Sequence, residues 1–257
     1  MRTATVGEIT RAIDEAAEKE PGGAIAFDGD GTLWSGDVGE DFFDAALKHG
    51  PREVTRAALV REAAEAGIEA KGSARDVAHA LHAAYLGGSF SEERICEIVA
   101  WIAAGWTRAE LDRFCAEAVV AWDLSARLHG EAMRVVEHAR KVGIEVFLVS
   151  ASPRGIVEAA AKVVGIEVAN VTAVEERVSA DGVVECGVLR PIPYGEGKVT
   201  NLRAKLGPTR KLYAAFGDNA FDVPLLCAAQ HAVAVRPKMR LLERRSEVPG
   251  LVVLEQV

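Results

Sequence analysis

The feature that most constrains this chain is an apolar run at residues 24–27 that ends on two carboxylates, Asp28 and Asp30, separated by one glycine. The run begins just after a Pro-Gly-Gly turn, which is typical of a short buried strand. In an open α/β sheet, ligands bind at the carboxyl ends of the strands. Two carboxylates on one tight turn repel each other unless a proton or a hard cation lies between them. The pattern therefore predicts a strand that ends in an acidic, ligand-binding turn.

Glycines follow both carboxylates of this turn. Gly29 and Gly31 allow a sharp change of chain direction, and we expect them to leave room for a bulky ligand. A single Asp-Gly pair is a common turn. Two such pairs in succession, directly after an apolar strand, favour a functional site.

Apolar runs and amphipathic helices alternate in the last part of the chain. Besides residues 24–27, strands are predicted at residues 144–149, 168–174, 212–216 and 231–235. Helices are predicted at residues 6–19, 130–141, 156–164, 195–206 and 221–229, and a β-hairpin at residues 177–188. Alternating strands and helices are typical of a parallel sheet covered on both faces. The predicted fold class is therefore α/β, with a doubly wound, Rossmann-like parallel sheet.

The segment between the acidic turn and residue 124 is helical in character. It is rich in Ala, Glu and Arg, it shows no strand pattern, and Pro51 and several glycines divide it into separate helices. We therefore expect an all-helical domain of residues 37–124, inserted into a core domain formed by residues 1–36 and 125–257.

Composition argues against several kinds of partner and location. The formal net charge of −8 argues against a nucleic acid or an anionic membrane as the main partner. No uncharged apolar run approaches bilayer length, and the first residues are not an apolar segment, so we expect neither a transmembrane helix nor an ordinary signal peptide. The four cysteines show no paired spacing, which predicts free thiols in a cytoplasmic protein. A small anionic substrate stays compatible, because it needs only a local positive site.

Polar side chains follow three of the predicted parallel strands. Asp28 and Asp30 follow the first, Ser150 the second and Asp218 the third, and Lys198 begins a helix between the last two. Each of these residues is ordinary by itself, as a strand-end serine, a solvated lysine or a turn aspartate. Because the carboxyl ends of parallel strands share one edge of a sheet, we expect them to gather carboxylates, a hydroxyl and one ammonium group.

In their order along the chain, these motifs resemble those of the haloacid dehalogenase superfamily of phosphohydrolases, in particular its phosphoserine-phosphatase-like branch. The resemblance covers nearly the whole chain. The first motif is at residues 27–33, the second at Ser150, the third at Lys198 and the fourth at residues 217–219, with Asp222 four positions after Asp218. The helical insertion is similar to the cap domain of that family.

The resemblance implies a Mg²⁺-dependent phosphatase of small phosphomonoesters. Asp28 would be the nucleophile that forms an aspartyl-phosphate, and Asp30 the general acid and then the general base. Mg²⁺ would be bound by Asp28, the backbone carbonyl of Asp30 and Asp218, and Asp222 would orient this metal shell.

The remaining motif residues would bind the substrate. The resemblance implies that Ser150 and the backbone N–H of Ala151 bind the phosphoryl oxygens, with Asn219 also at the substrate. Lys198 would add positive charge at Asp28 and the phosphate.

The alcohol part of the substrate is less constrained. Asp37 stands nine positions after Asp28, where phosphoserine phosphatases carry the acidic residue that binds the substrate amine. An amine-bearing phosphomonoester such as phosphoserine or phosphocholine is one interpretation, and an Asp37 that only caps a helix is the other. Gly31 and Phe221 depart from the phosphoserine pattern, which has Ser and Asn there.

Further side chains are candidates for binding this part of the substrate. The four tryptophans could form an aromatic wall for a quaternary ammonium group or could belong to the core. Arg52, Arg56 and Arg61 are the candidates for binding a substrate carboxylate.

Two alternatives stay open. The chain could be a phosphotransferase on the same scaffold, or a catalytically silent protein that binds a metabolite. Asp30 favours ester hydrolysis over phosphonate hydrolysis and over dehalogenation, neither of which needs it in the related enzymes. All four motifs are present, which favours an enzyme.

Overall fold

The computed structural model describes residues 2–256, and a seven-stranded sheet lies at its centre. The strand order is β1-β9-β8-β7-β2-β3-β4, and each neighbouring pair is parallel. The strands are β1 (Arg2–Ala4), β2 (Ala24–Phe27), β3 (Glu145–Pro153), β4 (Val171–Val174), β7 (Leu212–Gly217), β8 (His231–Ala234) and β9 (Val252–Leu254). The predicted α/β fold class is confirmed.

Strand β2 lies in the middle of the sheet, between β7 and β3. All four of its residues are buried, and they alternate between the two faces of the sheet. Ile25 and Phe27 belong to the larger hydrophobic core, whereas Ala24 and Ala26 belong to the smaller one. The apolar run is continuous because both faces of this strand are covered.

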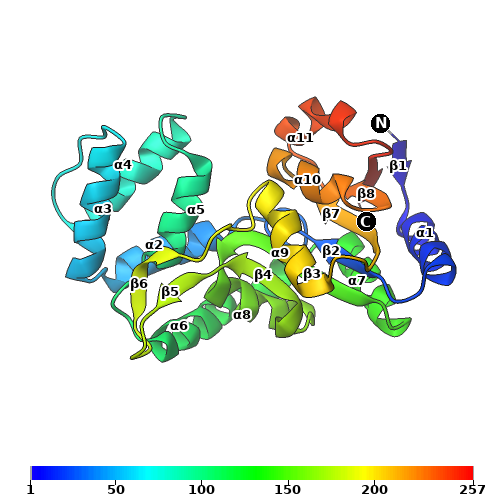
Figure 1. Cartoon of the computed structure of the whole chain (residues 1–257), viewed down its shortest axis with the longest axis horizontal. Coiled ribbons are helices and arrows are strands. Elements are labelled where there is room, and N and C mark those ends of the chain that lie inside the picture. The colour runs from blue at the N-terminus through cyan, green and yellow to red at the C-terminus, as the bar shows by residue number, and fades with distance from the viewer. Residues whose placement is uncertain (1, 257) are drawn as a thin grey trace.

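Helices cover both faces (Figure 1). On the side of the larger core lie α1 (Val6–Lys19), α7 (Gly130–Lys141) and α8 (Arg154–Val164). On the other side lie α9 (Glu196–Leu206), α10 (Val223–Cys227) and α11 (Met239–Glu243). Leu202 and Leu206 of α9 pack with Leu225 and Leu226 of α10 in the smaller core.

Five α-helices lie between β2 and α7 along the chain. They are α2 (Val38–His49), α3 (Glu53–Glu65), α4 (Ala74–Leu86), α5 (Glu92–Trp101) and α6 (Arg108–Ala121). Figure 1 shows α3, α4 and α5 at one end of the molecule, away from the sheet, while α6 lies beside α8. Ser91 and Thr107 cap the starts of α5 and α6 through their hydroxyl groups.

The predicted hairpin is formed by β5 (Glu176–Val178) and β6 (Val184–Val188), and it packs against these helices. The N–H of Gly105 donates to the carbonyl of Val184 at 2.8 Å, and the N–H of Val184 donates to the carbonyl of Trp106 at 2.9 Å. The hairpin is therefore joined by backbone hydrogen bonds to the connection between α5 and α6.

The structure corrects the predicted elements in several places. Of the strand predicted at residues 168–174, Val168–Asn170 form a 3₁₀ turn and only Val171–Val174 form β4. Strands β1 and β9 were missed, because three-residue strands at one edge are too short to show a periodic pattern. Strand β3 continues to Pro153, so Ser150 lies within the strand rather than after it. The helix predicted at residues 221–229 is a 3₁₀ turn at Ala220–Asp222 followed by the short α10.

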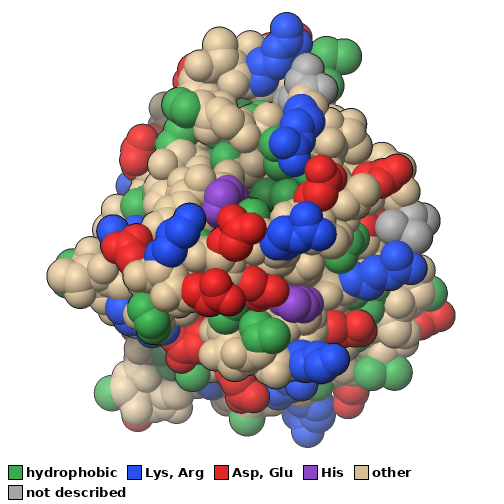
Figure 2. Space-filling view, turned by 90° about the vertical axis from the view of Figure 1, so that its right-hand side faces the viewer, with side chains coloured by type: hydrophobic (Ala, Val, Ile, Leu, Met, Phe, Trp, Pro, Cys, Tyr) green, Lys and Arg blue, Asp and Glu red, His purple; other side chains and the backbone are tan. Residues whose placement is uncertain are grey.

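The surface at the end that carries α1 and β1 has mixed charge. Figure 2 shows acidic and basic side chains interspersed there, with single hydrophobic side chains between them. None of the described helices combines the length and the hydrophobicity that crossing a bilayer requires.

The aromatic pair at the centre of the sheet gives a test of the fold. Phe27 of β2 and Phe216 of β7 stack with ring centroids 4.0 Å apart, and both are fully buried. Replacing Phe216 with Ala leaves a cavity, so we expect the free energy of unfolding in urea to fall by about 3–5 kcal/mol. Val120 on α6 is 77% exposed, and Val120→Ala should change the free energy of unfolding by less than about 0.5 kcal/mol. Equal effects of the two substitutions would contradict this packing.

Candidate active site

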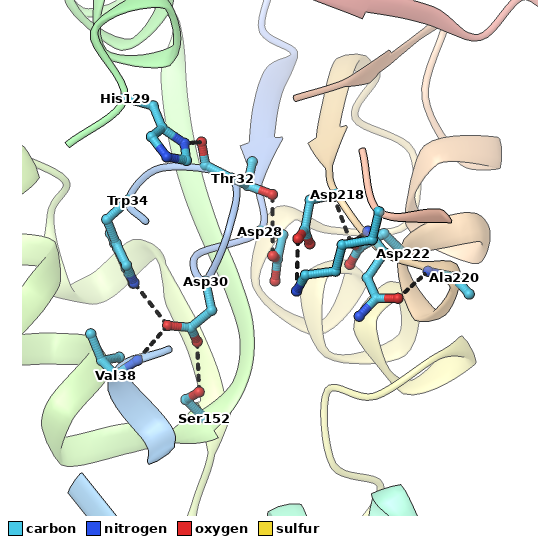
Figure 3. Close-up of polar contacts among 12 residues, drawn as sticks. Asp28, Asp30, Thr32, Trp34, Val38, His129, Ser152, Asp218, Ala220 and Asp222 are labelled. Carbon is cyan, nitrogen blue, oxygen red and sulfur yellow. Dashed lines mark hydrogen bonds and ion pairs between the residues drawn. The ribbon is translucent and has the colours of Figure 1, made fainter. Parts of the chain in front are cut away.

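Three aspartates form a buried cluster at the carboxyl ends of β2 and β7. One carboxylate oxygen from each of Asp28, Asp218 and Asp222 lies within 4.8 Å of the others, and all three residues are buried (Figure 3). Asp28 directly follows β2 and Asp218 directly follows β7, and these strands are neighbours in the sheet. The predicted convergence of strand-end carboxylates is therefore found.

Lys198 is fully buried within this cluster. Its ammonium group lies 2.6 Å from Oδ1 of Asp28 and 2.5 Å from Oδ1 of Asp222. Lys198 is on the first turn of α9, so the helix carries the charge to the edge of the sheet. A second ammonium group, on the half-exposed Lys238, lies 2.8 Å from Oδ2 of Asp218. Three carboxylates against two ammonium groups leave an excess of negative charge.

Burial and this excess of negative charge shift the pKa values of the cluster. Burial, and then the nearby Asp222 carboxylate, raise the pKa of Asp28 well above its usual range, although Lys198 opposes them. The same two causes raise the pKa of Asp218 to about 6. Burial alone would lower the pKa of Lys198, but Asp222 and Asp28 outweigh it and raise that pKa. A cation bound among these carboxylates would relieve the repulsion.

The donor atoms fit a hard divalent cation. Oδ1 of Asp218 is buried and has no hydrogen-bond partner among the residues that the structure describes. Both oxygens of Asp222 are already engaged, because Oδ1 contacts Lys198 and Oδ2 accepts from the N–H groups of Asp218 and Asn219. Oδ1 of Asp218 is therefore the carboxylate oxygen most available to a metal ion, and Asp28 lies beside it with Oδ2 held only by the Thr32 hydroxyl at 3.2 Å. Oxygen donors suit Mg²⁺. Asp222 fixes Lys198 and the loop after β7.

The carboxylate of Asp30 points away from this cluster (Figure 3). Its Oδ1 accepts from Nε1 of Trp34 at 2.8 Å and from the N–H of Val38 at 2.7 Å. Its Oδ2 accepts from Oγ of Ser152 at 2.7 Å. The repulsion expected between Asp28 and Asp30 is thus avoided by separating the side chains. A metal contact through the Asp30 backbone carbonyl stays a prediction.

The glycines of the acidic turn have a different role from the predicted one. Gly31 has φ +80°, and a Cβ on it would lie 2.1 Å from Oδ2 of Asp218. A Cβ on Gly29 would lie 2.8 Å from the ring of Trp34. The expectation that these glycines leave room for a ligand is wrong, because protein side chains fill that space.

His129 and Thr32 support the acidic turn on the side away from the cavity. Nδ1 of the buried His129 lies 3.0 Å from the carbonyl of Thr32, and Oγ1 of Thr32 donates to Oδ2 of Asp28 at 3.2 Å. Burial lowers the pKa of His129, which keeps its ring neutral. This support orients Asp28.

The end of β3 contributes two hydroxyl groups with different surroundings. Ser150 is fully buried, and its Oγ accepts from the N–H of Ser152 at 3.0 Å. Ala151 and Ser152 line the cavity above the cluster. On the β7 side Asn219 also lines it, and its Oδ1 accepts from the N–H of Ala220 at 2.8 Å.

A cavity of about 130 Å³ lies above these residues, between the sheet edge and the inserted helices. Besides the residues at the strand ends, Tyr194, Phe221 and Lys238 line it from the core side. From the inserted segment it is lined by Asp37, Gly39, Glu40, Tyr85, Glu92, Ile95, Cys96 and Val99.

Asp37 caps α2, as one of the two interpretations of its position predicted, and amine binding stays a prediction. It is the N-cap of α2, where its Oδ1 accepts from the N–H of Glu40 at 3.0 Å, and it also lines the cavity. None of the three candidate arginines is among the described residues that line the cavity. Arg52 and Arg56 contact Glu110 and the carbonyl of Gly72, and Arg61 lines a separate cavity.

The aromatic wall of the cavity consists of Tyr85, Tyr194 and Phe221, and no tryptophan is among its described lining residues. Trp34, Trp101 and Trp106 are buried in the larger core. The core interpretation of these three residues is therefore correct.

Four site residues escaped the sequence analysis: Thr32, His129, Ser152 and Lys238. Ser152 and Thr32 lie two residues after Ser150 and Asp30, within the motifs, and could have been found there. His129 and Lys238 carry no local signal, because each reaches the site from a segment distant in the chain.

A family profile described as haloacid dehalogenase-like hydrolase matches residues 25–226. No curated protein matches the chain. Among solved structures, a protein of unknown function from Bordetella pertussis Tohama I is similar at 22% identity, covering 90% of this chain and 97% of that one, with a TM-score of 0.67.

Two further solved structures share the fold. A phosphoserine phosphohydrolase-like protein from Francisella tularensis is 15% identical, covering 90% of this chain and 95% of that one, with a TM-score of 0.56. A substrate-bound phosphoserine phosphatase is also 15% identical, covering 90% and 92%, with a TM-score of 0.53.

The family match extends over most of the chain and includes all four motifs. The chain belongs to the haloacid dehalogenase-like hydrolase family. The resemblance inferred from the motifs is confirmed, and the protein is an enzyme of the hydrolase class.

The close approach of Gly31 to Asp218 can be tested by metal binding. Gly31→Ala would push the Asp218 carboxylate out of place, so we expect its Kd for Mg²⁺, measured by calorimetry, to rise at least about tenfold. Gly143 has φ +76° and open space around it, so Gly143→Ala carries a similar backbone strain without this contact. That control should bind Mg²⁺ like the wild type. Unchanged affinity in Gly31→Ala would contradict the assignment of Asp218.

Proposed function

We propose that this protein is a Mg²⁺-dependent phosphatase that hydrolyses a small phosphomonoester through an aspartyl-phosphate on Asp28. The observation that carries the proposal is the buried Asp28, held by Lys198 beside the unpartnered oxygen of Asp218 at the floor of a cavity. The names of two similar folds, a phosphoserine phosphatase and its phospho-aspartyl intermediate analogue, agree with this chemistry.

Asp28 is the nucleophile in this proposal. Lys198 and Thr32 fix its two oxygens at 2.6 and 3.2 Å, which orients the carboxylate toward a phosphorus atom in the cavity. Asp28 and Asp218 would hold Mg²⁺, which when bound offsets the repulsion between the anionic nucleophile and the anionic ester. Asp222 holds Lys198 in place, so that its charge stays at the reacting centre.

Asp30 is the general acid for the leaving alcohol and then the base for the attacking water. Its Oδ1 faces two N–H groups, which can only donate, so Oδ2 is the oxygen that would carry the proton of the acid form. The partner of Oδ2 is the hydroxyl of Ser152, which can donate to a carboxylate and accept from a carboxylic acid. Ser152 therefore positions Asp30 in both protonation states.

The strand-end loops would bind the phosphoryl group. We assign Ser150, which is buried next to the lining residue Ala151, and the N–H of Ala151 to its oxygens, with Asn219 on the β7 side of the cavity. Asp37, on the cavity wall, would face the alcohol part, which favours an ester that carries an amine or an amino acid.

We also propose that residues 37–124 act as a cap over a core of residues 1–36 and 125–257. The cavity between them would admit substrate when the cap opens and exclude water when it closes. The hairpin β5–β6 is hydrogen-bonded to the cap segment and would move with it. We place the protein in the cytoplasm, because its four cysteines are unpaired.

Removing the nucleophile tests the reaction. Asp28→Asn should lower the kcat for p-nitrophenyl phosphate at least about a thousandfold, because the amide cannot form the covalent intermediate. EDTA should abolish wild-type activity, and Mg²⁺ should restore it. Asp181→Asn, on the exposed hairpin turn, is the matched control and should keep full activity. Unchanged turnover in Asp28→Asn would contradict the mechanism, and transfer to added alcohols would favour a phosphotransferase.

The positioning role of Ser152 can be tested with two esters whose leaving groups differ in their need for a proton. Ser152→Ala should lower the kcat/KM for an alkyl phosphate, whose alkoxide must be protonated, by about tenfold. The loss for p-nitrophenyl phosphate should be less than about threefold, because p-nitrophenolate leaves without a proton. Ser125→Ala, at an exposed hydroxyl that contacts Asp123, is the control. An equal loss on both esters would mean that Ser152 supports only the structure.

A further inference from the structure

We propose that the cavity selects phosphomonoesters whose alcohol part carries an ammonium group and no carboxylate. This inference rests on the proposed phosphatase function and narrows its substrate class. It follows from the charges, the aromatic rings and the arginine positions around the cavity.

The inserted helices present only acidic charges to the cavity among its described lining residues: Asp37, Glu40 and Glu92. On the core side, the lining ammonium group of Lys238 is paired with Asp218. Glu40 contacts His82, and Glu92 contacts Arg240, whose side chain is 69% exposed. No described ion pair includes Asp37. Burial, and then the nearby Asp30 carboxylate, raise the pKa of Asp37 to about 8, so a cation bound in the cavity would favour its charged form.

The pKa values of two neutral side chains in the cavity wall, Tyr85 and Cys96, are raised by burial and by the same acidic residues. Burial, and then Glu92, raise the pKa of Tyr85 to about 12. Burial, and then Asp37 and Glu92, also raise the pKa of the Cys96 thiol. The phenol and the thiol therefore stay uncharged at neutral pH, and a cation is the charge that this environment favours.

Three aromatic rings face the same space as these carboxylates. Tyr194 and Phe221 lie with ring centroids 5.4 Å apart, and Tyr85 stands on the cap side. The hydroxyl of Tyr194 donates to Oε2 of Glu92 at 3.3 Å, which fixes the ring beside an acidic group. Aromatic faces next to carboxylates are a favourable environment for primary and quaternary ammonium groups.

A substrate carboxylate would find no matching partner here. Arginine is the usual residue for binding a carboxylate, and none is among the described residues of this cavity. The carboxylate of phosphoserine would instead approach Asp37, Glu40 and Glu92, and it would lose its hydration without a compensating ion pair.

The preference for a positively charged alcohol part is tested with pairs of esters that have nearly the same shape and differ in charge. Phosphocholine is compared with 3,3-dimethylbutyl phosphate, and phosphoethanolamine with n-propyl phosphate. In at least one pair, kcat/KM for the cation should exceed that for the neutral ester about tenfold or more. Phosphoethanolamine should exceed phosphoserine by a similar factor. The pair with the larger ratio of kcat/KM, cationic over neutral ester, shows whether the cavity prefers a quaternary or a primary ammonium group. Ratios near one in both pairs, or a preference for phosphoserine, would overturn the inference.

Two substitutions show where selection arises. Asp37→Asn keeps a good N-cap for α2 and removes the charge, and Glu92→Gln removes the charge beside Tyr194. Each should lower the ratio of cationic to neutral ester at least about threefold. Glu93→Gln, on the exposed side of α5, is the matched control and should keep the wild-type ratio. An unchanged ratio in both cavity variants would refute the role of these carboxylates.

Failure of this inference can be told from failure of the proposed function. If p-nitrophenyl phosphate is hydrolysed but the ester pairs show no preference, only the selection for a cation is wrong. If no ester is hydrolysed, the phosphatase proposal fails, and calorimetry with Mg²⁺ compares the Kd values of the same pairs on the wild-type protein. Tighter binding of the cations would then still support the inference, and equal binding would refute it.

Discussion

The buried contact of Lys198 with Asp28 and Asp222 is the interaction on which the site depends. Three carboxylates at one sheet edge would be costly to bury, because each loses its hydration and repels the others. The ammonium group from α9 offsets part of this cost and ties together loops that follow β2 and β7. The negative charge that Lys198 does not offset, at Asp28 and Asp218, makes the site suitable for a divalent cation.

A second set of contacts connects Asp30 with the inserted helices. Asp30 accepts a hydrogen bond from the N–H of Val38, the first residue of α2, and another from Ser152 at the end of β3. The proposed acid is thus held jointly by the first inserted helix and by the end of β3. Because α2 also presents Asp37 to the cavity, the same helix end connects the acid to the part of the wall that faces the substrate.

The central strands of the fold could be predicted, and the edge strands could not. Strand β2 is covered on both faces, so its run of apolar residues is strong, and the same holds for most of β3 and β7. Strands β1 and β9 are three residues long; β9 pairs with the edge of β8, and β1 pairs with β9. The family and the motif residues could likewise be predicted, because Asp28, Ser150, Lys198 and Asp218 each stand in a local pattern.

The sequence by itself determined which segments carry the motif residues, and that one edge of a parallel sheet would bring them together, since these depend on local pattern and on the geometry of parallel strands. Only the tertiary structure decided that Asp222 rather than Asp30 completes the buried carboxylate cluster, and that tyrosines rather than tryptophans face the cavity. Those outcomes depend on contacts between side chains far apart in the chain, such as Ser152 with Asp30, and no local pattern specifies them.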